Sequence, residues 1–153
     1  MQLYREKERD KIMLRGVDFQ AKAWEFFPKL VSVMDVLAYD WYIDDVDMNY
    51  FKFQSGRYTG RKFEKVLADI TELSFARIRR YPFGVNVREI NCYEDWRQSA
   101  CDLLILFYDG GIFEIYAKEE GLIHEIFKLC QKNNLEHIEF LTDENDARTH
   151  MYF

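Results

Sequence analysis

The sequence predicts an α+β fold in a single domain, with a mixed, mostly antiparallel sheet packed by about three helices. Its length of 153 residues is typical of one domain. A hydrophobic content of 48%, with only 7 Gly and 2 Pro, indicates a folded chain with a substantial core. Strand-like segments joined by short turns outnumber strand–helix–strand units. We expect a charged extension at residues 1–12 and one α+β domain at residues 13–153.

The first part of the domain predicts a strand, a helix and two aromatic strands. Residues 12–19 alternate between apolar and polar side chains, which is typical of a strand. Apolar residues then recur at helical spacing over 21–35, where Pro28 removes one backbone donor and predicts a kink or a restart. Strands are expected at 39–44 and 48–53, on either side of an acidic turn.

The middle of the chain predicts a helix entered through a glycine-bearing loop. Residues 55–60 form this loop, and the hydroxyl of Thr59 is placed to cap the following helix. Within 60–71 the apolar residues fall at i, i+3, i+4 and i+7, so one face of the helix packs on the core.

A strand with two arginines on one face follows this helix. Residues 73–81 alternate so that Arg77, Arg79 and Tyr81 share a face of the predicted strand. A turn containing proline and glycine comes next, and residues 85–90 are predicted to pair back as another strand.

The last third predicts the centre of the sheet. The segment 101–108 is apolar on both pleat faces, as expected for a strand that is covered on both sides. Asp109-Gly110-Gly111 predicts a tight hairpin. The other elements are a helical turn at 93–98, a strand at 112–117, a helix opened by Glu119 and Glu120 and ended by Asn133 and Asn134, and a strand at 136–142.

Charge and composition exclude several classes of protein. Lys and Arg total 21 and Asp and Glu total 27, so the net charge is 21 − 27 = −6, which argues against a general nucleic-acid binder. No apolar run approaches a membrane span, and the charged start lacks the centre of a secretory signal, so we expect a cytoplasmic protein. Cys92, Cys101 and Cys130 form no CxxC pair and are expected as buried thiols, with a Cys92–Cys101 disulfide left open.

The sequence contains no catalytic motif, so no catalytic residue, metal ligand or cofactor is predicted. His124, His137 and His150 form no HExxH or HxH pair, and neither a GxSxG elbow nor a phosphate-binding GxxxxGK[ST] loop is present. The carboxylate clusters do not match a calcium loop, and catalytic carboxylate pairs remain a minor alternative.

Acidic residues gather in two places, and aromatic residues crowd around the first of them, which predicts a protein-binding surface. Large rings beside carboxylates are typical of such surfaces and suit a basic partner. The partner-binding residues predicted on this basis are Asp40, Trp41, Tyr42, Asp44, Asp45, Asp47, Tyr50, Asp143, Glu144 and Asp146.

Two alternatives stay open. The basic loop over 55–62 opens onto a helix N-terminus, so Arg57, Arg61 and Lys62 are candidates for binding an anionic ligand in a small enzyme or ligand-binding protein. The aromatic strands are also candidates for self-pairing in a homo-oligomer.

Four stretches resemble a small family of uncharacterised bacterial proteins classed as a domain of unknown function. They are Arg15-Gly16-Val17-Asp18-Phe19, Tyr39-Asp40-Trp41-Tyr42-Ile43, Asp109-Gly110-Gly111 through Phe113-Glu114-Ile115-Tyr116-Ala117-Lys118, and Thr142-Asp143-Glu144-Asn145-Asp146-Ala147-Arg148. The resemblance implies a single-domain cytoplasmic protein with no known activity and transfers no site residue.

The chain also resembles bacterial immunity proteins in composition, being small, acidic and rich in aromatic residues. The leading hypothesis is therefore a non-enzymatic binding protein, of the immunity or antitoxin type, that neutralises a basic toxin or nuclease domain.

Overall fold

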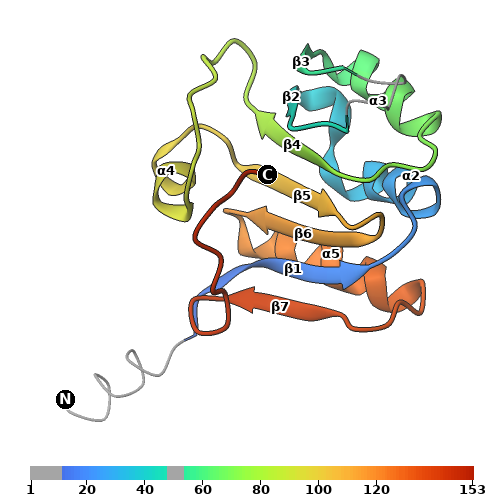
Figure 1. Cartoon of the computed structure of the whole chain (residues 1–153), viewed down its shortest axis with the longest axis vertical. Helices are drawn as coiled ribbons and strands as arrows, with labels where there is room; N and C mark the ends of the chain where they lie inside the picture. The colour runs from blue at the N-terminus through green and yellow to red at the C-terminus, as the bar shows by residue number, and fades with distance from the viewer. Residues whose placement is uncertain (1–11, 48–53) are drawn as a thin grey trace.

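A computed structural model describes residues 12–47 and 54–153 of the chain. Its centre is a seven-stranded sheet with the strand order β3-β2-β4-β5-β6-β1-β7 (Figure 1). Every strand pair is antiparallel, which confirms the predicted α+β class. The strands are β1 (Leu14–Gln20), β2 (Asp40–Asp44), β3 (Gly56–Tyr58), β4 (Ala76–Tyr81), β5 (Leu103–Tyr108), β6 (Ile112–Ala117) and β7 (Glu139–Thr142).

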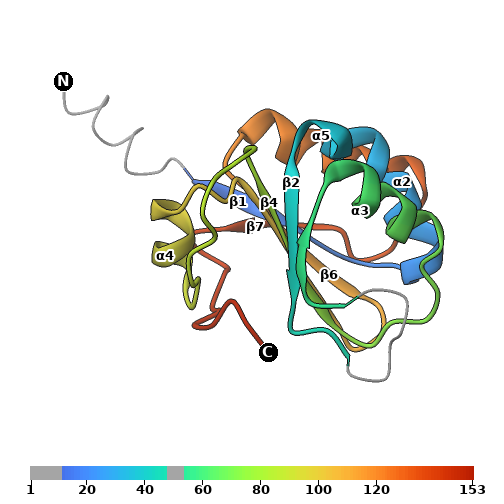
Figure 2. The same ribbon diagram turned by 90° about the horizontal axis from the view of Figure 1, so that it is seen from above.

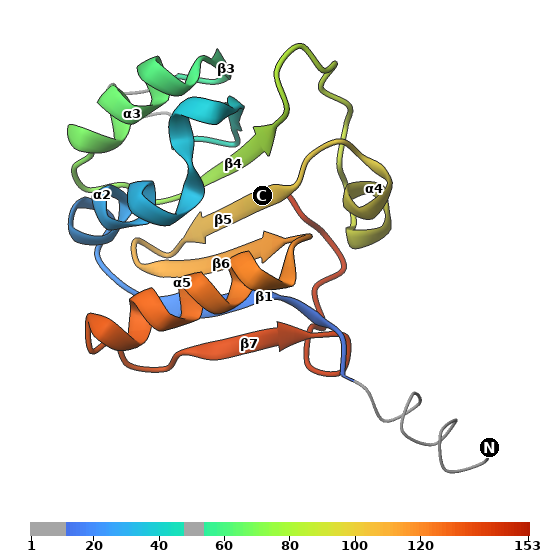
Figure 3. The same ribbon diagram turned by 180° about the vertical axis from the view of Figure 1, so that it is seen from behind.

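The helices divide unequally between the two faces of the sheet. Helices α2 (Ala23–Met34), α3 (Gly60–Ala68) and α5 (Glu120–Lys132) cover one face, which we call the apolar face (Figure 3). On the opposite face, which we call the polar face, residues 12–47 and 54–153 place only the short α4 (Tyr93–Gln98) and irregular segments, including the last residues of the chain (Figure 2). A 3-10 turn, η1 (Val36–Ala38), links α2 to β2.

The apolar face is held by a cluster of phenylalanine rings. Phe113 on β6 lies at its centre, with its ring 4.8 Å from Phe19, Phe27 and Phe107 and 5.8 Å from Phe26. All five rings are fully or almost fully buried. Aromatic pairs at these separations add to the stabilisation from burial, so α2 is fixed firmly on the sheet.

Arg80 is a buried charged residue on the otherwise apolar face. Its guanidinium donates to the carbonyl of Met34 at the end of α2 (2.8 Å) and to Asp102 (2.7 Å), and lies over the ring of Tyr39. A cation is favourable beside the free carbonyls at a helix C-terminus. Arg80 therefore joins β4 to the last turn of α2.

The polar face carries charged residues in cross-strand register. One row runs Asp18, Glu114, Leu106, Arg77 and Asp44 across strands β1, β6, β5, β4 and β2. A second row runs Gly16, Tyr116, Leu104, Arg79 and Tyr42. Cross-strand partners project from the same side of a sheet, so each row lies on one face.

Gly16 lets β1 enter the sheet close to β6. A Cβ atom at this position would lie 1.8 Å from the carbonyl oxygen of Ile115, so any side chain would displace the strand. The pairing of β1 with β7 is irregular between Leu14 and Gly16. The glycine is therefore required by a close backbone approach.

Several predicted elements are confirmed. The hydroxyl of Thr59 accepts from the backbone N–H of Lys62 (3.2 Å) and caps α3. Asp109 and Gly110 both have positive φ, at 51° and 68°, in the hairpin between β5 and β6. Asn134 adopts a φ of 55° just beyond α5, as expected for a left-handed residue. Helix α2 runs through Pro28 as one element, so the predicted restart of the helix there is wrong.

The predicted strand at 85–90 is wrong. Strand β4 already pairs with β2 on one edge and with β5 on the other, so no edge is left for a hairpin partner. The predicted loop at 55–60 instead contains the edge strand β3. The predicted strand at 48–53 and most of the extension at 1–12 lie outside the described residues.

Candidate functional site

The polar face contains a groove at the junction of β2, β4 and the segment after β4. Its volume is about 760 Å³, within the range of small-molecule and peptide sites. We call it the arginine groove, and it is lined by Tyr42, Asp44, Asp45, Arg77, Arg79, Val87, Arg88, Glu89, Asn91 and Tyr152. Figure 1 shows β2 and β4 side by side next to this segment.

A buried ion-pair network forms the floor of the arginine groove. Asp44 accepts two hydrogen bonds from Arg77, at 2.8 and 2.6 Å, and one from Arg79 at 3.1 Å. Both arginines are almost fully buried. Burial alone would lower the pKa of Arg77, but the hydrogen bonds and the charge of Asp44 raise it. Two cations therefore share one carboxylate inside the protein.

Both guanidinium groups also donate to the backbone after β4. Arg77 donates to the carbonyl of Ile90 (2.6 Å), and Arg79 donates to the carbonyl of Arg88 (3.0 Å). At the edge of the sheet, Arg57 donates to the carbonyl of Val85. Side-chain donors thus replace the strand partner predicted for 85–90. The Nε atom of Arg79 is buried and has no hydrogen-bond partner within the described residues.

A second groove of about 500 Å³ lies farther along the charged row, and we call it the carboxylate groove. Asp18 and Glu114 face each other across β1 and β6 at its floor. Arg148 pairs with Glu114 at 2.7 Å. Partial burial, together with the charges of Glu114 and Glu139, raises the pKa of Asp18 to about 6, against the opposing effect of Arg148.

Residues 147–153, which we call the strap, cross the polar face between the arginine groove and the carboxylate groove. Figure 2 shows this final segment on the side of the sheet opposite α2, α3 and α5. Met151 is 1% exposed, whereas Tyr152 and Phe153 are 40% and 42% exposed. Tyr152 lines both grooves.

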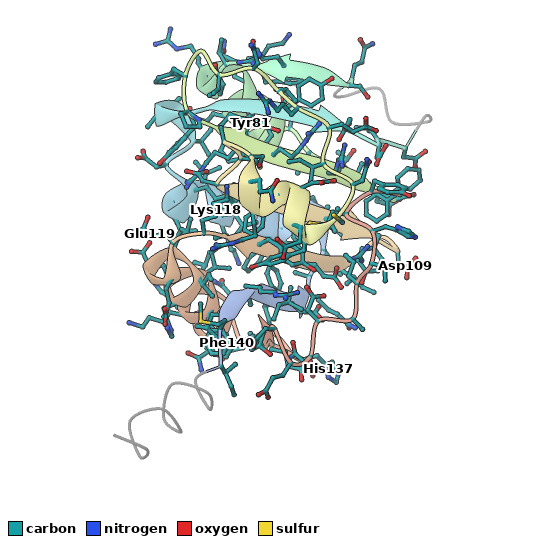
Figure 4. All side chains as sticks on the ribbon, turned by 90° about the vertical axis from the view of Figure 1, so that its left-hand side faces the viewer. Tyr81, Asp109, Lys118, Glu119, His137 and Phe140 are labelled. Atoms are coloured by element: carbon teal, nitrogen blue, oxygen red, sulfur yellow. The ribbon has the colours of Figure 1, made fainter. Side chains whose placement is uncertain are left out.

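Beside the strap, α4 closes the rest of the polar face. Trp96 of α4 packs against Tyr116 of β6, with ring centroids 5.9 Å apart, and Lys118 lies 5.4 Å from the Trp96 ring. Figure 4, in which α4 faces the viewer, labels Tyr81 and Lys118 near this helix. Burial raises the pKa of the neighbouring Cys101 thiol to about 12, so this cysteine is inert at neutral pH. All three cysteines are free.

The structure corrects part of the predicted partner surface. Trp41 is fully buried, stacks on Phe63 at 4.3 Å and donates from its indole to the carbonyl of Val36, so the expectation that its ring is exposed is wrong. Alternation along β2 turns Trp41 toward the helices and Tyr42 toward the polar face. Tyr42 lies under the guanidinium of Arg79 and lines the arginine groove. Tyr50 lies outside the described residues.

The predicted carboxylates fall into different environments. Asp44 forms ion pairs with the buried Arg77 and Arg79, and Asp45 accepts a hydrogen bond from the backbone N–H of Phe153 at 3.0 Å. Asp40 pairs with Arg57 at 2.9 Å. Asp47 is partly buried, and its backbone N–H donates to Phe75.

The second predicted acidic cluster lies at the other end of the polar face. Asp146 pairs with Arg15 (3.3 Å) and accepts from the hydroxyl of Tyr116. Asp143 and Glu144 are exposed in the turn after β7. The two clusters therefore flank the strap rather than form one patch.

Arg57, Arg61 and Lys62, the predicted anion-binding residues, have different surroundings. Arg57 is paired with Asp40, and the ammonium of Lys62 lies over the ring of Tyr58. Arg61 is exposed on α3. A small hollow along α3 is lined by Lys62 and Lys65 but by neither of the other two residues.

Asp18, Glu114 and Arg148 are site residues that sequence reasoning missed. The alternation of β1 and β6 places Asp18 and Glu114 on one face of their strands, and this signal was available. The pairing of Asp18 with Glu114 could not be predicted, because no local sequence pattern shows that β1 lies between β6 and β7. Within the described residues, no group of three or more His, Cys, Asp or Glu is placed to hold a metal ion, and no helix there has the length and apolar character to cross a membrane.

Fold and site together define a class: an α+β protein with an antiparallel sheet, covered by helices on one face and grooved and charged on the other. The chain belongs to the family described as "Protein of unknown function (DUF2691)", whose model matches residues 14–152. It is also similar to the uncharacterized protein YncE of Bacillus subtilis (strain 168), with 33% identity over 75 residues. This match covers 49% of each chain, so the chain spans about half the length of that relative. No solved structure matches the chain.

Contacts on the polar face link three of the four stretches that carry the family resemblance. Arg15 in the first stretch pairs with Asp146 in the last. Glu114 in the third stretch pairs with Arg148 in the last. These two ion pairs join the first, third and last stretches at the polar face.

Proposed function

We propose that the protein is a non-enzymatic binding protein that engages a basic protein partner at the mouth of the arginine groove. In its finer form, the proposal is an immunity or antitoxin type of inhibitor whose partner is a toxin such as a nuclease domain. The observation that carries the proposal is the pair of exposed rings, Tyr152 and Phe153, beside the carboxylates Asp45 and Glu89.

Exposed aromatic rings next to carboxylates suit a protein interface. Rigid rings bury a large area at a low entropic cost, and they are common among the residues that dominate binding energy. The net charge of −6 would steer a basic partner toward the protein and raise the association rate at low salt. Asp45 and Glu89 are the carboxylates best placed for this role, because both line the groove and Asp44 is neutralised by two buried arginines.

The test is the association rate of a partner captured from native cells and then purified. We expect the variant Asp45→Asn, Glu89→Gln to associate about fivefold more slowly at low salt, with the difference disappearing at high salt. Asparagine at position 45 keeps an acceptor for the Phe153 N–H. The matched control is Glu120→Gln, Glu125→Gln on α5, which removes charge from the other side of the molecule. Equal slowing in both variants would place the interface elsewhere.

A second candidate function is binding of a small anion in the same groove. It is favoured by the three arginines that line the groove and by the unpartnered Nε of Arg79. It ranks second because Asp44 already balances much of the charge of Arg77 and Arg79. A rise in melting temperature with millimolar phosphate or nucleotide would favour this function over the first.

A further inference from the structure

Strand β7 ends the sheet on the side away from β3, so it pairs with β1 along one edge and has a second, outer edge (Figure 1). Just beyond β7, the backbone N–H of Asp143 donates to the carbonyl of Met13, next to β1, at 3.1 Å. The N–H and carbonyl groups of successive strand residues point to opposite edges. Phe140 and Thr142 lie an odd number of positions before Asp143, so their backbone groups point outward.

The turn after β7 folds back and binds three of these outward groups. The side-chain oxygen of Asn145 accepts from the N–H of Thr142 at 2.8 Å, and its side-chain nitrogen donates to the carbonyl of Phe140 at 2.9 Å. The carbonyl of Thr142 accepts from the N–H of Asp146 at 3.1 Å. One side-chain amide thus donates to and accepts from the edge as a neighbouring strand would.

Thr142 holds Asn145 in this position. Its hydroxyl accepts from the backbone N–H groups of Glu144 and Asn145, each at 3.2 Å. Such local bonds from a side chain to the backbone fix the shape of a turn. The amide of Asn145 is therefore placed against the edge by its own turn, and binding there has a low entropic cost.

The segment that carries this edge has the composition of a strand that joins other strands. Residues 138–142 read Ile-Glu-Phe-Leu-Thr and contain one charged side chain. Aromatic and β-branched residues favour strands, and unpaired backbone groups on an edge are a template for another chain. Phe140 stacks on Phe127 of α5 at 4.1 Å and is only partly buried. Without its cover, β7 would therefore be able to extend the sheet.

A second copy of β7 matches this edge. In an antiparallel pair centred on Phe140, the outward groups of this residue would bond to those of Phe140 in the second copy. Glu139 would lie opposite Leu141 of the second copy, so no like charges would meet. The two Phe140 rings would lie on the same face as cross-strand neighbours, an arrangement that stabilises paired strands.

We infer that Asn145 is a guard residue that keeps β7 from pairing with a second copy of the chain. Its amide occupies the backbone groups that a further strand would use. It is attached to the same chain, so it competes at a high effective concentration. The inference goes beyond the proposed function and is independent of it, because Asn145 does not line the arginine groove.

The test compares the full chain with its variant Asn145→Ala by analytical ultracentrifugation and by amide hydrogen exchange, in reducing buffer and over a range of protein concentrations. In the dilute variant, the N–H of Thr142 should exchange at least about tenfold faster than in the wild type, because it has lost its acceptor. As the concentration rises, the variant should form a dimer in which the N–H groups of Phe140 and Thr142 become protected. In the wild type, exchange at these two positions should not depend on concentration.

Two controls identify the group responsible. Thr149→Ala changes an exposed, uncharged residue near the same turn and should behave like the wild type. Asn145→Asp keeps an acceptor for the N–H of Thr142 and adds a negative charge at the edge, so it should not dimerise through β7. Should Asn145→Ala not fold, Asn145→Ser, whose side chain is too short to reach the carbonyl of Phe140, is measured in the same way.

The exchange data decide between the outcomes. Protection of Phe140 and Thr142 that rises with concentration only in the folded alanine or serine variant supports the inference. The inference is overturned if this protection is absent from the variant, if it is equal in the wild type, or if the variant dimerises with other amides protected. None of these results bears on the association rate that tests the proposed function.

Discussion

The two faces of the sheet are built on different physical principles. On the apolar face, interlocked rings around Phe113 and three long helices exclude water. On the polar face, buried arginines are matched by one carboxylate and by backbone carbonyls, and the cover is a short helix and an irregular strap. Apolar burial is non-directional, whereas charge matching needs each partner in place. The polar face therefore leaves grooves, and these are where function is expected.

The largest difference between the faces should appear on removing one ring from each. Phe113→Ala deletes the centre of the apolar cluster, and we expect a loss of about 3–5 kcal/mol in the free energy of unfolding. Phe153→Ala removes a ring that is 42% exposed and should cost less than about 1.5 kcal/mol. Urea unfolding followed by circular dichroism measures both values. Similar losses would mean that the strap is as much a part of the core as β6.

A second experiment tests charge matching on the polar face. Asp44→Asn keeps the shape of the side chain but leaves Arg77 and Arg79 without a counter-charge, and we expect a loss of about 2–3 kcal/mol. The control is Asp40→Asn, whose partner Arg57 is 41% exposed, so the expected loss is less than about 1 kcal/mol. Equal effects in urea unfolding would show that the buried network is not what holds the segment after β4.

Local sequence patterns predict much of the contrast between the two faces. They predict the arrangement of the polar face only in part. Alternation places Arg77, Arg79 and Tyr81 on one face, and the structure confirms this. Their burial depends on Asp44 and on the carbonyls of Arg88 and Ile90, which reach them only through the tertiary fold. Local patterns carry no information on such distant partners.

The same limit explains the prediction for Trp41. A ring among aspartates is typical of a surface, yet the position of Trp41 in β2 turns its side chain toward Phe63 on α3. The hairpin at Asp109 and the cap at Thr59 were predictable because the residues that fix them lie within a few positions.

The smallest expected effect concerns pH. The pKa of Asp18 is about 6 in the folded chain against an ordinary value of 3.8, so between these values the folded state binds more protons than the unfolded state. Stability should therefore fall as the pH rises from about 4 to about 6. Asp18→Asn should flatten this dependence and raise stability at pH 7 by about 1 kcal/mol, after allowance for partial solvent exposure. Melting temperatures across the pH range measure this effect, and an unchanged slope in the variant would assign the titration to another group.

The position of β1 has a consequence for how the chain acquires this structure. Gly16 pairs with Tyr116 on one side and Val17 pairs with Phe140 on the other, so the first strand is completed by some of the last segments in the chain. Neither edge of β1 can be satisfied until these distant residues arrive. A topology dominated by such non-local pairings has a high contact order, and loop closure must precede most of its stabilising contacts. We therefore expect slow folding for a chain of this size, with β7 joining the sheet only after β1 has paired with β6.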